Sequence, residues 1–155
     1  MRQILSQCLT YICCCLIQFC LGEYNTSKYF PNIALIVIIY IAFTKGALHA
    51  ELFGFFFGIT IDSLSIDIFG SKAITLTIIG YIFGKILIKF NKDQIITQCT
   101  IVFLASILYL AIIHSMYYIS SSNRILNYPY YVILIATITT VAFTPIIFNI
   151  LKKLG

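Results

Sequence analysis

The chain has 155 residues, of which 61% are hydrophobic and 10% are charged. A soluble domain is nearer half apolar and about a quarter charged, so this composition excludes an ordinary soluble protein and indicates an integral membrane protein. The net charge of +5 is dispersed, without a basic cluster among aromatic residues, so nucleic acid is not an expected partner.

The first apolar segment, 4–22, follows Arg2 and has the outline of a secretion signal, but its end lacks the small residues of a cleavage site. Phe19 is also too bulky for a lipoprotein-type processing site before Cys20. We therefore expect a retained first membrane span. We interpret its cysteines as small apolar packing residues because they form no CxxC pair, although the role of the cluster stays open. They are Cys8, Cys13, Cys14, Cys15 and Cys20.

The second apolar segment, 29–46, is short, because its uninterrupted part from Pro31 to Thr44 gives only about 21 Å of helix. We expect Pro31 in the first helical turn, where its missing N–H has no consequence, and Lys45 to reach the interface. A spanning helix needs about 20 residues, and four further segments are near that length. They are 48–66, 71–90, 95–119 and 129–151.

These segments predict an all-α integral membrane protein, a single transmembrane domain over 1–155 formed by a bundle of six transmembrane helices. The positive-inside rule supports this arrangement with both termini in the cytoplasm. The cytoplasmic side then receives Arg2, Lys45, Lys85, Lys89, Lys92, Lys152 and Lys153, and the outer side Lys28, Lys72 and Arg124. A five-span arrangement gives the same distribution, so the sequence leaves five or six open, while both place the C-terminus inside.

Two pairs of glycines predict a closely packed hairpin of the third and fourth spans. Gly54 and Gly58 are four residues apart, as are Gly80 and Gly84, and small residues at this spacing let helices approach closely in lipid. With a turn near Phe69 and Gly70, equal distances from Phe69 along the two helices place Gly58 opposite Gly80 and Gly54 opposite Gly84. Thr77 shares a helix face with the second pair. We expect these faces to hold the two helices together and to offer a platform for a partner's transmembrane helix.

Two acidic residues lie in the third segment. Glu51 is near its cytoplasmic end, at a depth similar to that of Lys85, which makes the two a candidate intramembrane ion pair. Asp62 lies deeper, where Thr75 and Thr77 are candidate donors and where protonation of the carboxyl is an alternative. Asp62 has no second acid, histidine or arginine at its depth, so the sequence favours a role in orienting or binding within the protein over proton transport.

Catalysis finds no support in the sequence. There is no Walker A motif, no HExxH, no G-x-S-x-G and no pair of acids with a base. His49 and His114 lie in different segments without metal-ligand spacing. We therefore predict a protein that is not an enzyme and that has no cofactor or metal site.

An ordered set of residues between 31 and 85 carries a family resemblance. It comprises Pro31, Asn32, Lys45, Gly46, Gly54, Phe55, Gly58, Asp62, Gly70, Gly80, Tyr81, Gly84 and Lys85. The set resembles the pattern of the MreD family, the rod-shape-determining membrane proteins of bacteria. That pattern has a proline-led span, then G-F-x-x-G-x-x-x-D, a turn glycine and a G-Y-x-x-G helix. Asn32 stands where many members carry an acidic residue, and the last two spans match only as hydrophobic helices.

The resemblance implies a non-catalytic scaffold of the cell-wall elongation machinery in the bacterial cytoplasmic (inner) membrane. Its implied partners are a single-span MreC-type protein, cytoplasmic actin-like MreB-type filaments and the peptidoglycan polymerase and transpeptidase, besides the lipid bilayer. The 85–92 loop would then face the filaments or anionic lipid. The alternative is a substrate-binding membrane subunit of a vitamin transporter, since the two folds are thought to be similar. Which helices contact which partner, and in what stoichiometry, the sequence leaves open.

Overall fold

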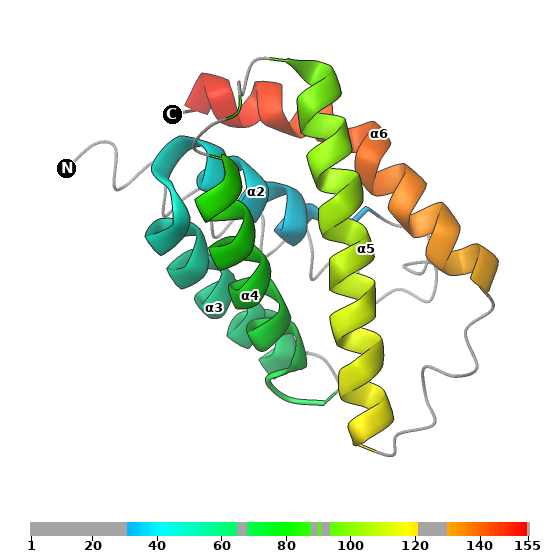
Figure 1. Ribbon diagram of the computed structural model, residues 1–155. Helices are drawn as coiled ribbons and strands as arrows, with labels where there is room; N and C mark the ends of the chain where they lie inside the picture. The colour runs from blue at the N-terminus through cyan, green and yellow to red at the C-terminus, as the bar shows by residue number, and fades with distance from the viewer. Residues whose placement is uncertain (1–30, 65–67, 88–89, 91–93, 121–129, 155) are drawn as a thin grey trace.

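The computed structural model describes residues 31–64, 68–87, 90, 94–120 and 130–154. In these ranges all regular secondary structure is helical, which confirms the predicted all-α class (Figure 1). The described helices are α2 (Ile33–Lys45), α3 (Ala47–Leu64), α4 (Ser71–Ile86), α5 (Ile95–Ile119) and α6 (Tyr130–Leu154). The predicted first span, 4–22, lies outside the described residues with its cysteine cluster.

Three of the described helices are long and apolar enough to cross a membrane: Ala47–Leu64, Ile95–Ile119 and Leu134–Lys153 of α6. The helix α2 is apolar but has only 13 residues, and α4 has 16. The six predicted spans are therefore supported in part, by three spanning helices and one shorter apolar helix. Of the other three predicted spans, 4–22 lies outside the described residues, and α2 and α4 are shorter than the apolar segments 29–46 and 71–90 that contain them.

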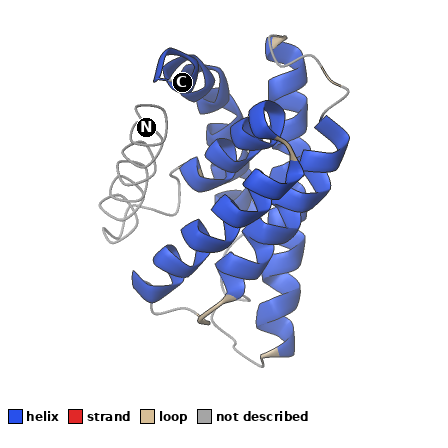
Figure 2. Cartoon of the chain, turned by 90° about the vertical axis from the view of Figure 1, so that its left-hand side faces the viewer, coloured by secondary structure: helices blue, strands red, loops and turns tan. Residues whose placement is uncertain are grey.

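The short helix α2 lies at the centre of the bundle and contacts α3, α4, α5 and α6. All six residues from Ala34 to Ile39 are buried, so every side of the helix is covered by protein. A helix that is hydrophobic all round belongs in the interior, and this position explains why α2 lacks a polar face. Figure 1 shows α2 between the α3–α4 pair and α5, and Figure 2 shows the bundle from a second direction.

The start of α2 differs from the expected one. Asn32 is the N-cap, and its side-chain Oδ1 accepts a hydrogen bond from the backbone N–H of Leu35 at 3.1 Å. Pro31 therefore precedes the cap instead of lying in the first helical turn, because Asn32 caps the helix and Ile33 is its first residue. The backbone N–H of Asn32 donates to Thr140 Oγ1 at 3.0 Å, which ties the start of α2 to α6.

The helix α6 contains Pro145, and in Figure 1 it changes direction between its orange and red parts. Proline lacks an N–H and crowds the carbonyl four residues earlier, so it bends a helix and frees that carbonyl. The freed carbonyl here is that of Val141, and Cys99 Sγ of α5 approaches it at 4.0 Å as a weak donor. The bend lets the end of α6 cross over α2, where Phe148 meets Tyr40 and Phe43 edge to face with centroid distances of 5.3 and 6.0 Å.

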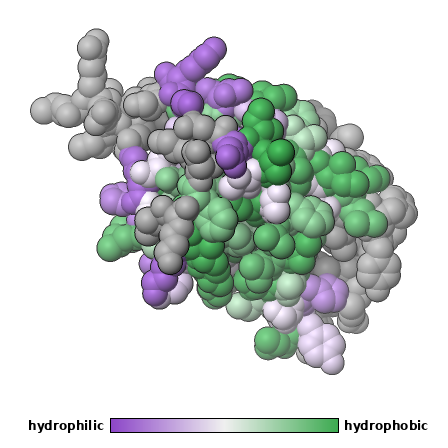
Figure 3. All heavy atoms as spheres, turned by 45° about the horizontal axis from the view of Figure 1, so that its top comes forward, coloured by the Kyte–Doolittle hydropathy of each residue, from purple (hydrophilic) through white to green (hydrophobic). Residues whose placement is uncertain are grey.

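The surface of the described helices is largely apolar. Large side chains such as Phe56, Phe103 and Ile138 are about half or more exposed. The green area across the middle of Figure 3 is formed by hydrophobic residues. In water such a surface would associate, whereas in a bilayer it is the surface that lipid solvates. The exposed side chains therefore fit a helical bundle that faces acyl chains.

Candidate functional site

The hairpin of α3 and α4 holds the four glycines predicted from the sequence, and all four are buried. Each lies against the backbone of the opposite helix. A Cβ at Gly54 would stand 2.6 Å from the carbonyl oxygen of Leu76, and one at Gly80 would stand 2.6 Å from that of Ala50. These distances leave no room for a side chain, so at these positions only glycine permits the observed approach of the helices.

The other two glycines make the closest approaches. A Cβ at Gly58 would overlap the Cα of Ala73, and one at Gly84 would overlap the Cα of Ala47. The obstructing atoms belong to the backbone, which cannot turn away as a side chain can. The glycine face is thus filled by contact within the chain, so a transmembrane helix of a partner would meet the outer surface of the hairpin.

The register of the hairpin differs from the expected one, in which Gly58 faced Gly80 and Gly54 faced Gly84. Gly58 instead faces Ala73, seven residues or about two helical turns earlier in α4. The expectation assumed a turn centred on Phe69. In the structure α3 ends at Leu64 and α4 begins at Ser71, directly after Gly70, so the centre of the connection lies earlier in the chain.

Asp62 explains how α4 is held in this register. Its side chain is 2% exposed and accepts hydrogen bonds from the backbone N–H groups of Lys72, at 3.1 Å to Oδ2, and Ala73, at 3.0 Å to Oδ2. The first N–H groups of a helix have no partner within it, and a carboxylate next to them is also favoured by the helix dipole. Asp62 of α3 therefore caps the N-terminus of α4 from a neighbouring helix.

The remaining N–H groups of the first turn are also satisfied. Ser71 N donates to Ile68 O at 3.2 Å, and Ile74 N donates to Gly70 O at 2.9 Å. Gly70 has φ of +90°, a left-handed conformation that glycine adopts without strain, and this places its carbonyl and the helix that follows. The cap residue itself offers no side chain, which is why the start of α4 depends on an acid ten residues earlier.

Thr75 and Thr77, the donors expected for Asp62, bond elsewhere. Thr75 Oγ1 donates to Ser71 O at 2.7 Å, and Thr77 Oγ1 donates to Ala73 O at 2.6 Å. A threonine in a helix readily bonds the carbonyl of its own preceding turn, which removes the need for a distant acceptor. Asp62 is served by backbone donors instead.

Lys85 has a different partner from the one expected. Its Nζ donates to the hydroxyl of Tyr81 at 2.6 Å and stands 4.6 Å from the centre of that ring. Glu51 lies level with Gly80, because its backbone nitrogen would be 3.0 Å from a Cβ there, and Lys85 is more than one turn further along α4. Lys85 is thus paired with the tyrosine one turn before it rather than with Glu51.

Three other residues of the family pattern lie in a helix connection or on the outer surface of the hairpin. Gly46 has φ of +83° between α2 and α3, which lets the chain reverse within one residue. Phe55 and Tyr81 point outward and are 45% and 43% exposed, so they belong to the outer surface of the hairpin and not to its seam.

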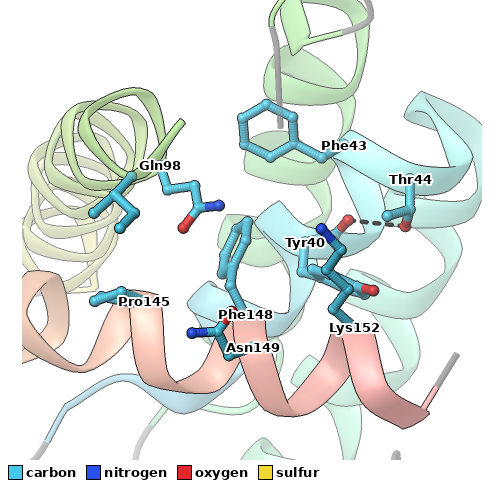
Figure 4. A pocket seen from close by; sticks show the side chains of 9 residues that line it. Tyr40, Phe43, Thr44, Gln98, Pro145, Phe148, Asn149 and Lys152 are labelled. Atoms are coloured by element: carbon cyan, nitrogen blue, oxygen red, sulfur yellow. Dashed lines mark hydrogen bonds between the residues drawn. The ribbon is translucent and has the colours of Figure 1, made fainter. Parts of the chain in front are cut away.

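A pocket that the sequence reasoning missed lies where α2, α5 and α6 meet, with a volume of about 170 Å³ (Figure 4). Its signal in the sequence was Pro145 in the last apolar segment, followed by Asn149 and Lys152 at helical spacing. Among described residues it is lined by Tyr40, Phe43, Thr44, Ile95, Gln98, Pro145, Phe148, Asn149 and Lys152. Within the part of the chain described here, no group of three or more His, Cys, Asp or Glu side chains is placed to hold a metal ion.

Comparison with protein families matches residues 2–154 to the model described as rod shape-determining protein MreD. The match extends well beyond residues 31–85, on which the resemblance was based, and includes the last two helices. No curated protein and no solved structure matches the chain. Since the family model covers nearly all of the sequence, the chain belongs to the MreD family of rod shape-determining membrane proteins.

Proposed function

We propose that this protein is a non-catalytic scaffold of the cell-wall elongation machinery in the bacterial inner membrane. It would connect an MreC-type single-span protein and MreB-type filaments to the peptidoglycan polymerase and transpeptidase. The observation that carries the proposal is the family match over residues 2–154, which assigns a role in rod shape. The hairpin adds physical support, because it is a rigid element and not a gate.

The rigidity follows from how the hairpin is assembled. The two helices touch backbone to backbone at four glycines, and the carboxylate of Asp62 is occupied by the N–H groups of Lys72 and Ala73. Close-packed backbones have little freedom to slide, and a carboxylate at 2% exposure has little access to water or cargo. A surface that must hold partners in fixed positions benefits from such an element.

The alternative, a vitamin-binding transporter subunit, has less support. Such a subunit needs a cavity for its cargo, and pockets for small molecules are typically about 300–1,000 Å³. The pocket between α2, α5 and α6 is smaller, at about 170 Å³, and Asp62 is not among the residues that line it.

Depletion of the protein in its own host tests the proposal. We expect rod-shaped cells to become round, and we expect added vitamins to leave this defect unchanged. Cells that keep their shape, or whose growth is restored by a vitamin, would contradict the scaffold role.

Partner binding is tested by co-purification of the MreC-type protein with the tagged chain from membranes. The unaltered chain should retain the partner, and Gly58→Leu should lose it, because separation of α3 and α4 reshapes the outer surface of the hairpin. Tagged protein in the membrane fraction is quantified in parallel, so that loss of the chain is distinguished from loss of the partner. Equal recovery with folded Gly58→Leu would show that the hairpin has no part in partner binding.

A further inference from the structure

The pocket between α2, α5 and α6 combines a positive charge with apolar walls. It opens where α2 and α6 end and α5 begins. In Figure 4, Gln98 of α5 lies on one side of the Phe148 ring, and Thr44 of α2 and Lys152 of α6 lie on the other. Its walls are formed by side chains such as Phe43, Pro145 and Phe148. A site with a polar end and an apolar body suits a ligand that is itself amphipathic.

The charge at this end of the bundle is positive. Lys152 is the one charged residue among the described residues that line the pocket, and no carboxylate lines it with them. Lysines also occupy the last turns of the helices that end on this side, Lys45 of α2, Lys85 of α4 and Lys153 of α6. An anion would therefore be attracted to the pocket and would find hydrogen-bond donors in it.

The donors are varied in chemistry. The Tyr40 hydroxyl and the Gln98 and Asn149 amides accompany the Lys152 ammonium, and Gln98 is 8% exposed. Phosphate oxygens accept from all of these groups. The volume of about 170 Å³ is too small for a whole lipid or a drug-sized ligand, but it accommodates a headgroup.

We propose that this pocket binds the phosphodiester headgroup of an anionic phospholipid. The lipid's acyl chains would continue along the apolar surface beside it, where Ile95 at the mouth is 60% exposed and Ile96 in the same turn is 82% exposed. A free phosphate would leave this apolar surface unused. The distribution of lysine and arginine predicts that this end of the bundle lies on the cytoplasmic side of the membrane. Anionic lipids on that side attract basic residues close to the membrane surface.

The pocket adds a function to the end of the bundle that is independent of the packing of α3 and α4. A bound anionic lipid would bridge α2, α5 and α6 at the level of the membrane surface. It would thereby make the arrangement of these helix ends depend on the lipid composition of the membrane.

The test uses the full chain in nanodiscs that contain equal parts of phosphatidylglycerol and phosphatidylcholine, followed by native mass spectrometry of the lipids retained after mild release. Lys152→Gln is compared with Lys153→Gln, since both lysines are exposed, adjacent on α6 and equal in charge, and only the first lines the pocket. We expect Lys152→Gln to lower phosphatidylglycerol retention about fivefold, the effect of one basic residue near an anionic surface, and Lys153→Gln to change it little.

Gln98→Leu provides a second variant, which removes a buried amide from the same pocket without changing the charge. It should also reduce phosphatidylglycerol retention, while leaving retention of phosphatidylcholine unchanged. A thermal unfolding curve for each variant establishes that the chain is folded before its lipids are compared.

Two results would overturn the proposal. Equal losses for Lys152→Gln and Lys153→Gln would mean that the lipid follows general surface charge and not the pocket. Displacement of phosphatidylglycerol by millimolar inorganic phosphate in the unaltered chain would mean that the pocket is a site for the free ion.

Discussion

The carboxylate of Asp62 accepts a hydrogen bond from the backbone N–H of Ala73 at 3.0 Å, and the same Ala73 lies against Gly58, one turn before Asp62 on α3. One side chain and one missing side chain on α3 thus act on the same residue of α4. The glycine sets how closely the helices approach, and the acid sets where along α3 the second helix begins. Both features can be tested separately.

Replacing Asp62 with alanine removes the cap of α4. The N–H groups of Lys72 and Ala73 would lose their acceptor in a buried place, and each unsatisfied group costs about 1–3 kcal/mol. We expect a clearly lower thermal unfolding midpoint in detergent for Asp62→Ala than for Asp62→Asn, whose amide oxygen can still accept. Ser63→Ala is the matched control, since Ser63 is exposed and bonds only its own helix at Ile59 O. An equally large decrease of the unfolding midpoint in Ser63→Ala would mean that the loss in Asp62→Ala does not come from removal of the cap.

Adding one methyl group at Gly58 should separate the helices. The Cβ of Gly58→Ala would overlap backbone atoms of Ala73, so the seam must open, and overpacking of this kind typically costs about 1–3 kcal/mol. Circular dichroism during heating should show a lower midpoint. Ala73→Gly should fail to rescue it, because the obstructing atoms are Cα and N and not the methyl of Ala73. Full recovery of the unfolding midpoint by Ala73→Gly would mean that the clash is with the methyl group of Ala73 and not with its backbone.

The control for this substitution is Phe56→Ala on the same helix. Phe56 is 58% exposed, so its removal deletes far more volume but leaves the seam intact. We expect a smaller loss of stability than for Gly58→Ala in detergent, despite the larger change in size.

Asn32 should behave as a replaceable cap. Asn32→Ala removes the acceptor of Leu35 N and is expected to cost about 0.5–2 kcal/mol, measured as a lower unfolding midpoint. Asn32→Asp keeps the acceptor and adds a negative charge at the start of α2, which the helix dipole favours, so it should match or exceed the original stability. Destabilisation by aspartate equal to that by alanine would argue against the cap.

Pro145 should control the direction of the last part of α6. In Pro145→Ala the N–H at this position can bond Val141 O, so the helix is expected to straighten and Phe148 to withdraw from Tyr40 and Phe43. Spin labels at the exposed positions Ile138 and Ile150, in a cysteine-free background, report the change as a longer distance in pulsed electron paramagnetic resonance. An unchanged distance would mean that packing against α2, and not the proline, bends the helix.

Much of the hairpin was predictable because its signals are local. The glycine spacing at Gly54 and Gly58, and again at Gly80 and Gly84, is visible in the chain, as is an acid within an apolar segment. All four glycines do lie in the contact between α3 and α4. The facing partners were wrong, because equal distance from a turn assumes a symmetric connection, and the α3–α4 connection is not symmetric.

The partners of polar groups were the least predictable. The sequence offered Thr75, Thr77 and protonation for Asp62, and Lys85 for Glu51. The sequence does not reveal which backbone N–H groups lack a partner. The start of a helix presents several of them at once, and it therefore attracts a carboxylate more strongly than a single threonine hydroxyl would. Lys85 likewise bonds Tyr81, one turn before it on the same helix, and not Glu51, the acid that the sequence suggested.

Hydropathy and residue spacing alone established that this chain is an all-helical membrane protein with a tight hairpin, because both are properties of consecutive residues. The tertiary structure alone decided that α2 is the buried centre, that Asp62 begins α4, and that the bend at Pro145 leaves a pocket beside Lys152. These features depend on atoms that are far apart in the chain, such as Asn32 and Thr140, and their distances are set only when the helices pack together.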